Sequence, residues 1–202
     1  MTMRPVVRLL VAVVAACAPL LSLAQAPPGV VRGTIVALAG DTLTVRTRGG
    51  HTETIALARN WSVTVLKPVP VSAIRPGSFI GTAEMPQGSD TGRSLEVHVF
   101  PPGVKAGEGH YPWSLRKGSM MTNGTVGQVT RSPNGRELTV TYPSGERHIV
   151  VPKGIPIVEF TNGDRSLVKP GIPAFLIVAR APGGELTSAG IAIGEHGAKP
   201  PM

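Results

Sequence analysis

The sequence contains one pattern twice, and this repeat limits the folds that the chain can adopt. Gly33-Thr34-Ile35 matches Gly124-Thr125-Val126 at a separation of 91 residues. Pro76-Gly77 matches Pro170-Gly171 at a separation of 94 residues. A nearly constant separation, altered only by short insertions, is what a duplicated segment leaves behind. Because each repeat is one structural unit, we expect two copies of one small domain.

Each copy has the pattern of short β-strands joined by tight turns. Apolar and polar residues alternate over short runs, and pairs such as Gly49-Gly50 and Asn134-Gly135 separate them. The abundance of glycine (25) and proline (20) argues against long helices. Ser72 and Asp164 suit the start of a single helical turn. We therefore expect an all-β protein with two tandem small OB-like barrels of five to six short strands each, since closure removes exposed strand edges.

The order of these motifs resembles a widespread family of exported bacterial OB-like domains of unknown function. The resemblance rests on Gly-Thr-Ile or Gly-Thr-Val, then Leu-Thr-Val, an apolar strand, a Pro-Gly turn and a last alternating strand, found in both copies. An acidic residue that usually follows the turn glycine in the family is replaced here by Ser78 and Ile172. The family implies no catalytic residue.

The remaining segments set the expected domain boundaries. Residues 1–24 have the basic start and apolar core of a signal peptide, so we expect a periplasmic or secreted protein. Cys17 offers an alternative, because its surroundings resemble the site at which lipoproteins are acylated. The first barrel is expected at 30–102, an irregular linker at 103–120, the second barrel at 121–194 and a flexible tail at 195–202. The mature chain has no apolar run of the roughly 20 residues needed to span a bilayer.

The linker concentrates side chains that bind soft metals. His110, Met120 and Met121 lie close together in the sequence, and His98 precedes them on the last strand of the first copy. Imidazole and thioether groups select ions such as Cu(I) and Ag(I), and Trp113 could cover a bound ion. This set is similar in chemistry to the periplasmic copper and silver chaperone of metal-efflux systems, which places its ligands on barrel strands. Copper is therefore the alternative cofactor, and the sequence otherwise indicates none.

The same linker also suits a packing role. Tyr111, Trp113 and Leu115 would hold it in a groove between the barrels, because large apolar side chains gain most from burial. The four phenylalanines stand where core residues are expected. They are Phe79, Phe100, Phe160 and Phe175.

The composition narrows the classes of function. No GxSxG, HExxH or phosphate-binding glycine loop occurs, so we expect no enzyme. Few aromatic residues (4%) and an exported chain argue against nucleic acid. The net charge of +8 favours an anionic envelope component or an envelope protein as partner. The sequence thus predicts a non-catalytic binding or scaffold protein of the cell envelope, with soft-metal binding as the alternative. It gives no oligomeric state.

Overall fold

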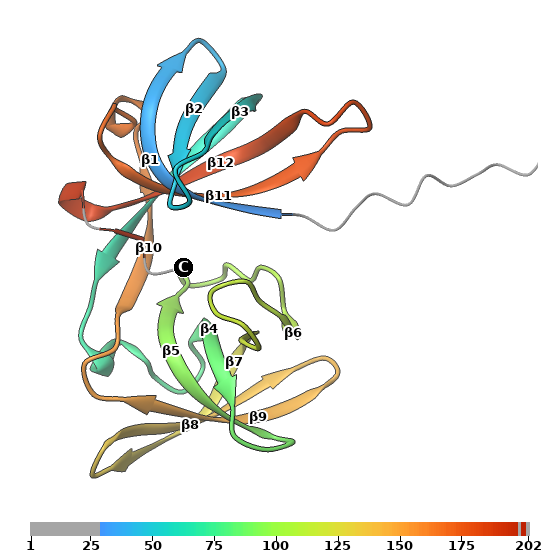
Figure 1. Ribbon diagram of the computed structural model, residues 1–202. Coiled ribbons are helices and arrows are strands. Elements are labelled where there is room, and N and C mark those ends of the chain that lie inside the picture. Colours follow the sequence, from blue (N-terminus) through green and yellow to red (C-terminus); the bar gives the residue numbers. More distant parts are fainter. Residues whose placement is uncertain (1–28, 198, 201–202) are drawn as a thin grey trace, which may run out of the picture.

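The computed structural model describes residues 29–197 and 199–200, and these form a single twelve-stranded sheet that curls into two lobes (Figure 1). The expected signal peptide and Cys17 lie outside the described residues. Three single 3-10 turns, η1 to η3, complete the structure. In the described part of the chain, no helix is long and apolar enough to cross a membrane. The strands are β1 (Gly29–Ala39), β2 (Thr42–Thr47), β3 (Thr52–Pro68), β4 (Phe79–Pro86), β5 (Thr91–Val99), β6 (Gly109–Pro112), β7 (Met120–Ser132), β8 (Gly135–Tyr142), β9 (Gly145–Pro152), β10 (Ile157–Gly163), β11 (Pro173–Arg180) and β12 (Leu186–Gly194).

Five strands close into a barrel, which we call the closed barrel. β1 pairs with β2 and β11, β3 pairs with β2, and β12 joins β11 to β3. Alternating side chains such as Leu43 and Val45 on β2 are fully buried inside it. Trp61 lies in the same core and donates a hydrogen bond to Asp41 at 3.2 Å. The expectation of an all-β fold with a barrel is confirmed.

The second lobe contains another circular series of pairings, the second ring. β4 pairs with β5 and β7, β8 pairs with β7 and β9, and β9 pairs with β5. Its apolar core includes Ile80, Val97, Val140 and Ile149. β10 joins the two lobes, because it pairs with β3 on one side and with β5 on the other.

The strand pairing crosses between the two halves of the sequence. The hairpin of β4 and β5 pairs with the second half, through β7 and β9, whereas the hairpin of β11 and β12 pairs with the first half, through β1 and β3. The Pro-Gly turns follow the same rule. Gly77 N–H donates to Val126 O at 2.8 Å, and Gly171 N–H donates to Ile35 O at 2.8 Å. Each turn therefore fastens its hairpin to a strand of the other half.

Two tandem barrels are not confirmed, and the pairing does not follow the expected boundaries at 30–102 and 121–194. Local signals predicted short alternating strands and the turns between them, but not β6. They also do not specify which of the two three-stranded meanders, β1–β3 or β7–β9, a hairpin joins. The helical turns are present at η1 (Val71–Ala73) and η2 (Arg165–Leu167). Asp164 caps η2 by accepting from Ser166 N–H at 2.8 Å, whereas Ser72 lies inside η1 instead of starting it. The segment 103–120, expected to be irregular, contains β6, and the expected tail 195–202 begins with η3 (Glu195–Gly197).

Candidate functional site

A groove of about 770 Å³ lies where the closed barrel, the second ring and β10 meet. The chain has four phenylalanines, two tryptophans and two tyrosines, and five of these eight aromatic residues line the groove. Aliphatic side chains, including Val30, Ile177 and Ile191, form much of the remaining wall, and a smaller number of polar side chains also line it. The aromatic members are Phe100, Tyr111, Trp113, Phe160 and Phe175. A large concave surface of mostly apolar character is the usual form of a small-molecule site.

The aromatic rings support one another across elements that are far apart in the sequence. Phe160 on β10 lies edge-on to Phe100, with ring centroids 4.8 Å apart, and stacks on His98 of β5 at 5.3 Å. Trp113 packs against Phe175 of β11 at 6.3 Å and against Tyr111 at 6.4 Å. Such offset and edge-on pairs are favourable geometries. The groove walls are therefore held in place without a ligand.

The linker forms one wall of this groove. β6 pairs with β7, so that Tyr111 lies opposite Met121 and His110 lies opposite Thr122. The side-chain amide of Asn123 donates to Gly107 O and to the Tyr111 hydroxyl, both at 2.9 Å. These bonds fix the side of the linker that carries Tyr111.

Of the three residues expected to pack the linker, two reach the groove. Tyr111 and Trp113 line it, and the Trp113 backbone is held by Ser119, whose carbonyl accepts from Trp113 N–H at 2.8 Å. Leu115 is half-buried and does not line the groove.

The expected metal ligands lie on opposite faces of the sheet around β7. Neighbouring residues of a strand point to opposite faces, so Met120 lies on the face of Thr122 and His110, while Met121 lies on the other face. Met121 and His98 both line the groove. The structure thus places His98 and Met121 along the same groove but does not bring all four residues to one site. Among the described residues, no group of three or more His, Cys, Asp or Glu side chains could hold a metal ion.

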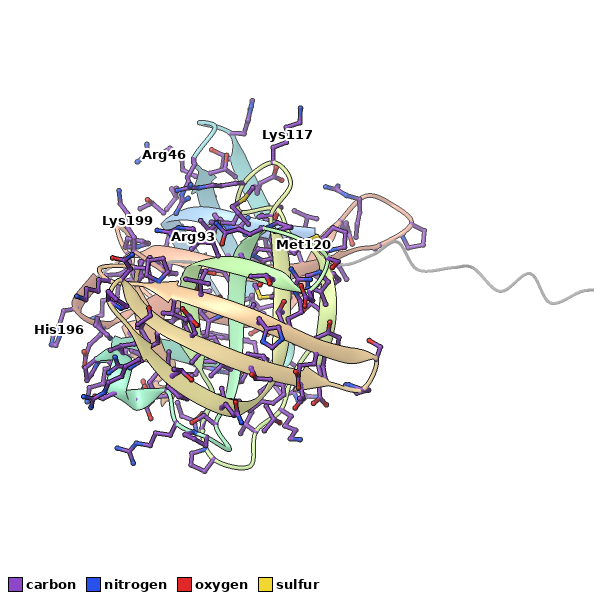
Figure 2. All side chains as sticks on the ribbon, turned by 90° about the horizontal axis from the view of Figure 1, so that it is seen from below. Arg46, Arg93, Lys117, Met120, His196 and Lys199 are labelled. Atoms are coloured by element: carbon purple, nitrogen blue, oxygen red, sulfur yellow. The ribbon has the colours of Figure 1, made fainter. Side chains whose placement is uncertain are left out.

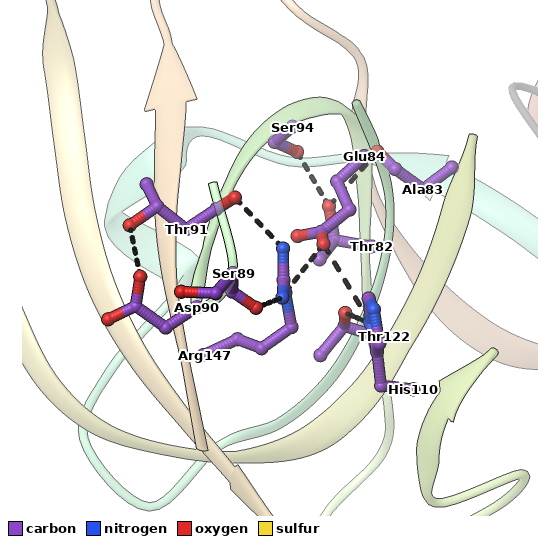
Figure 3. A network of polar contacts seen from close by, with 10 residues as sticks. All are labelled: Thr82, Ala83, Glu84, Ser89, Asp90, Thr91, Ser94, His110, Thr122 and Arg147. Carbon is purple, nitrogen blue, oxygen red and sulfur yellow. Dashed lines mark hydrogen bonds and ion pairs between the residues drawn. The ribbon is translucent and has the colours of Figure 1, made fainter. Parts of the chain in front are cut away.

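A polar cluster that sequence reasoning missed lies inside the second ring (Figure 3). Glu84 on β4 is fully buried and forms an ion pair with Arg147 of β9, with Oε1 and Nε 2.7 Å apart. Arg147 also donates to Ser89 O at 2.8 Å and to Thr91 O at 2.9 Å. Burial raises the pKa of Glu84, although Arg147 acts in the opposite direction. The guanidinium both neutralises the carboxylate and ties β9 to the turn before β5.

His110 closes the open side of this cluster. Its Nδ1 lies 2.8 Å from the Thr122 hydroxyl and 3.8 Å from Glu84 Oε1. Burial lowers the pKa of His110, and the nearby Arg147 cation lowers it further. Because the hydroxyl and the carboxylate approach the same ring nitrogen, the imidazole does not link an acid to a nucleophile through its two nitrogens as a hydrolytic triad requires. The cluster is best explained as internal support for the second ring.

A second buried pair lies next to the groove. His98 Nε2 is 3.0 Å from Glu96 Oε1, and both side chains are almost fully buried. The imidazole ring of His98 also stacks on Phe160, with ring centroids 5.3 Å apart. His98 is therefore engaged in the groove wall.

No protein-family model, curated protein or solved structure matches the chain. The resemblance to exported OB-like domains stays a prediction.

The groove could not be located from the sequence, because its walls come from strands whose pairing crosses between the halves. We expected all four phenylalanines in the core. Phe79 and Phe175 are buried there, although Phe175 also lines the groove. Phe100 and Phe160 are only partly buried, and both line the groove. The linker wall of the groove could be anticipated, because the composition of the linker, with its aromatic residues, differs from that of the repeats.

Proposed function

We propose that this chain is an exported binding protein of the bacterial cell envelope that holds a small apolar molecule in the groove. The concentration of five of its eight Phe, Trp and Tyr residues around a volume of about 770 Å³ carries the proposal. Burial of apolar ligand surface against such walls supplies the main driving force for binding. The signal-like start of the sequence supports an envelope location, and the site geometry suggests binding without catalysis.

The position of the groove fits a finer description of the fold. We interpret the two lobes as two five-stranded barrels, each built from the meander of one repeat and the hairpin of the other. The groove would then lie at the junction of the two barrels, where β10 passes between them. Clefts at such junctions are common ligand sites.

A fluorescent apolar probe, N-phenyl-1-naphthylamine, tests the proposed function. We expect saturable binding to the mature chain with one probe per molecule, because the groove is preformed. Ile177 lines the groove and is 56% exposed, so Ile177→Lys should place a charge at its mouth without disturbing the core. This substitution should weaken binding at least about tenfold, which corresponds to about 1.4 kcal/mol of lost apolar contact.

Val36→Lys is the matched control. Val36 is also a strand residue, is 43% exposed and does not line the groove. The Val36→Lys variant should bind the probe with the same affinity as the wild type. Absence of saturable binding, or equal losses in both variants, would contradict the proposed function.

A further inference from the structure

A second hollow lies beside the groove and is strongly basic. This cleft of about 280 Å³ is lined by four cationic side chains, and among the residues that the structure describes no acidic side chain lines it. Figure 2 shows Arg46 and Lys199 projecting from the same side of the molecule. The four cationic residues are Arg32, Arg46, Arg48 and Lys199.

The cleft and the groove lie along one face of the ribbon formed by β1 and β11. Val30 pairs with Ile177, and both line the groove. Two residues further along β1, Arg32 pairs with Phe175, and Phe175 lines both hollows. Every second residue of a strand faces the same side, so Val30 and Arg32 lie on the same face of β1. This face is therefore apolar at Val30 and cationic at Arg32, the next residue on the same side.

β2 brings the other two arginines to the same place. Arg46 pairs with Thr34 of β1, and Arg48 N–H donates to Arg32 O at 3.3 Å. Burial and the like charge of Arg48 lower the pKa of Arg32, while buried Glu96 opposes this shift. An anion bound in the cleft would therefore reduce the repulsion between Arg32 and Arg48 in the folded chain.

The Arg32 guanidinium marks the boundary between the two hollows. Its central carbon lies 5.3 Å from the ring centroid of Phe175 and 5.7 Å from that of Trp113, and both rings line the groove. It also donates to the Ser114 hydroxyl at 3.1 Å. These contacts hold a positive charge at the end of the apolar groove.

We propose that the natural ligand is an anionic amphiphile, with its apolar body in the groove and a phosphate or carboxylate head in the basic cleft. This inference rests on the proposed function, because the groove must hold the apolar body. Arginine side chains are suited to planar, bidentate recognition of both kinds of head group.

Displacement of N-phenyl-1-naphthylamine by four competitors tests the inference. Decyl phosphate, 1-decanol and decylamine share one chain and differ in the head group, and inorganic phosphate has no chain. We expect decyl phosphate to bind at least about tenfold more tightly than 1-decanol at low salt, with decylamine weakest. The advantage of decyl phosphate should shrink as salt is added.

Paired substitutions locate the head-group site. Arg46 and Arg48 are exposed, so Arg46→Gln with Arg48→Gln should fold normally and lose most of the preference for decyl phosphate over 1-decanol. Arg93→Gln with Arg131→Gln removes the same charge from exposed positions outside the cleft and should keep the preference.

The outcomes separate this inference from the proposed function. If the probe itself does not bind, the proposed function fails. If the probe binds but 1-decanol or decylamine competes as well as decyl phosphate, only the inference fails. Inorganic phosphate that binds as tightly as decyl phosphate would also overturn it, because the cleft would then hold a free anion.

Discussion

At the scale of single residues, the buried ion pair of Glu84 and Arg147 is the most sensitive point of the second ring. Arg147→Met should lower the free energy of unfolding by about 3–5 kcal/mol, because it leaves the Glu84 carboxylate buried without a cation. Denaturant unfolding of the purified chain measures this loss.

The double variant Glu84→Gln with Arg147→Met is the control for that prediction. It leaves no buried charge, so it should recover part of the stability that the single variant loses. A loss of less than about 1 kcal/mol in the single variant, the size typical of exposed ion pairs, would contradict the prediction, because it would mean that solvent reaches and stabilises the Glu84 carboxylate.

His110 should make stability depend on pH. Its pKa in the folded chain is lowered from the ordinary value of 6.5, so the unfolded chain takes up a proton first as the pH falls. The contribution of neutral His110 to folding is therefore present above pH 6.5 and is lost as the pH drops below it. Unfolding free energies measured between pH 8 and pH 5 should fall less steeply in His110→Gln than in the wild type. Equal slopes would contradict the prediction.

At the scale of elements, the turn at Gly171 fastens the β11–β12 hairpin to β1. Gly171 has a φ of +88°, a conformation that disfavours any residue with a Cβ, and its N–H bonds to Ile35 O. Gly171→Ala should cost about 1–2 kcal/mol of unfolding free energy, although nothing lies within 4 Å of the added Cβ. Thermal unfolding measures the loss.

Gly183 provides a matched control in the turn between β11 and β12. It also has open space around the position of a Cβ but has no positive φ. Gly183→Ala should therefore be neutral or raise the stability slightly, by up to about 1 kcal/mol. Equal losses at both glycines would show that backbone strain is not the cause.

These elements also show how far the sequence predicts the structure. The Pro-Gly turns, the Asp164 cap and the alternating strands follow from local patterns, so they could be predicted. The partner of each turn could not, because the repeated strand occurs in both copies and the local sequence does not say which copy Gly77 bonds to; in the structure it is Val126 of the second copy. The groove could not be predicted for the same reason. Phe160 and Phe100 have the pattern of core residues, and they meet only because β10 pairs with β5.

At the scale of the whole molecule, the crossed pairing makes the two lobes depend on each other. The closed barrel takes β11 and β12 from the second half, and the second ring takes β4 and β5 from the first. Neither half of the chain contains all the strands of either lobe. We therefore expect calorimetry to show one cooperative unfolding transition, whereas two independent tandem barrels would give two.

Cutting the chain in the exposed segment at Val104 and Lys105 gives a direct test of this dependence. The cut leaves all five strands of each lobe available, so fragments 29–104 and 105–200 should stay together as a 1:1 complex during gel filtration. Separated under denaturing conditions and refolded alone, neither fragment can form the crossed pairs. Each should then either remain largely unfolded or associate with a second copy of itself, which could supply the missing hairpin. If each fragment instead refolds as a compact monomer, a hairpin can close on its own meander, and the crossed pairing is not required for folding.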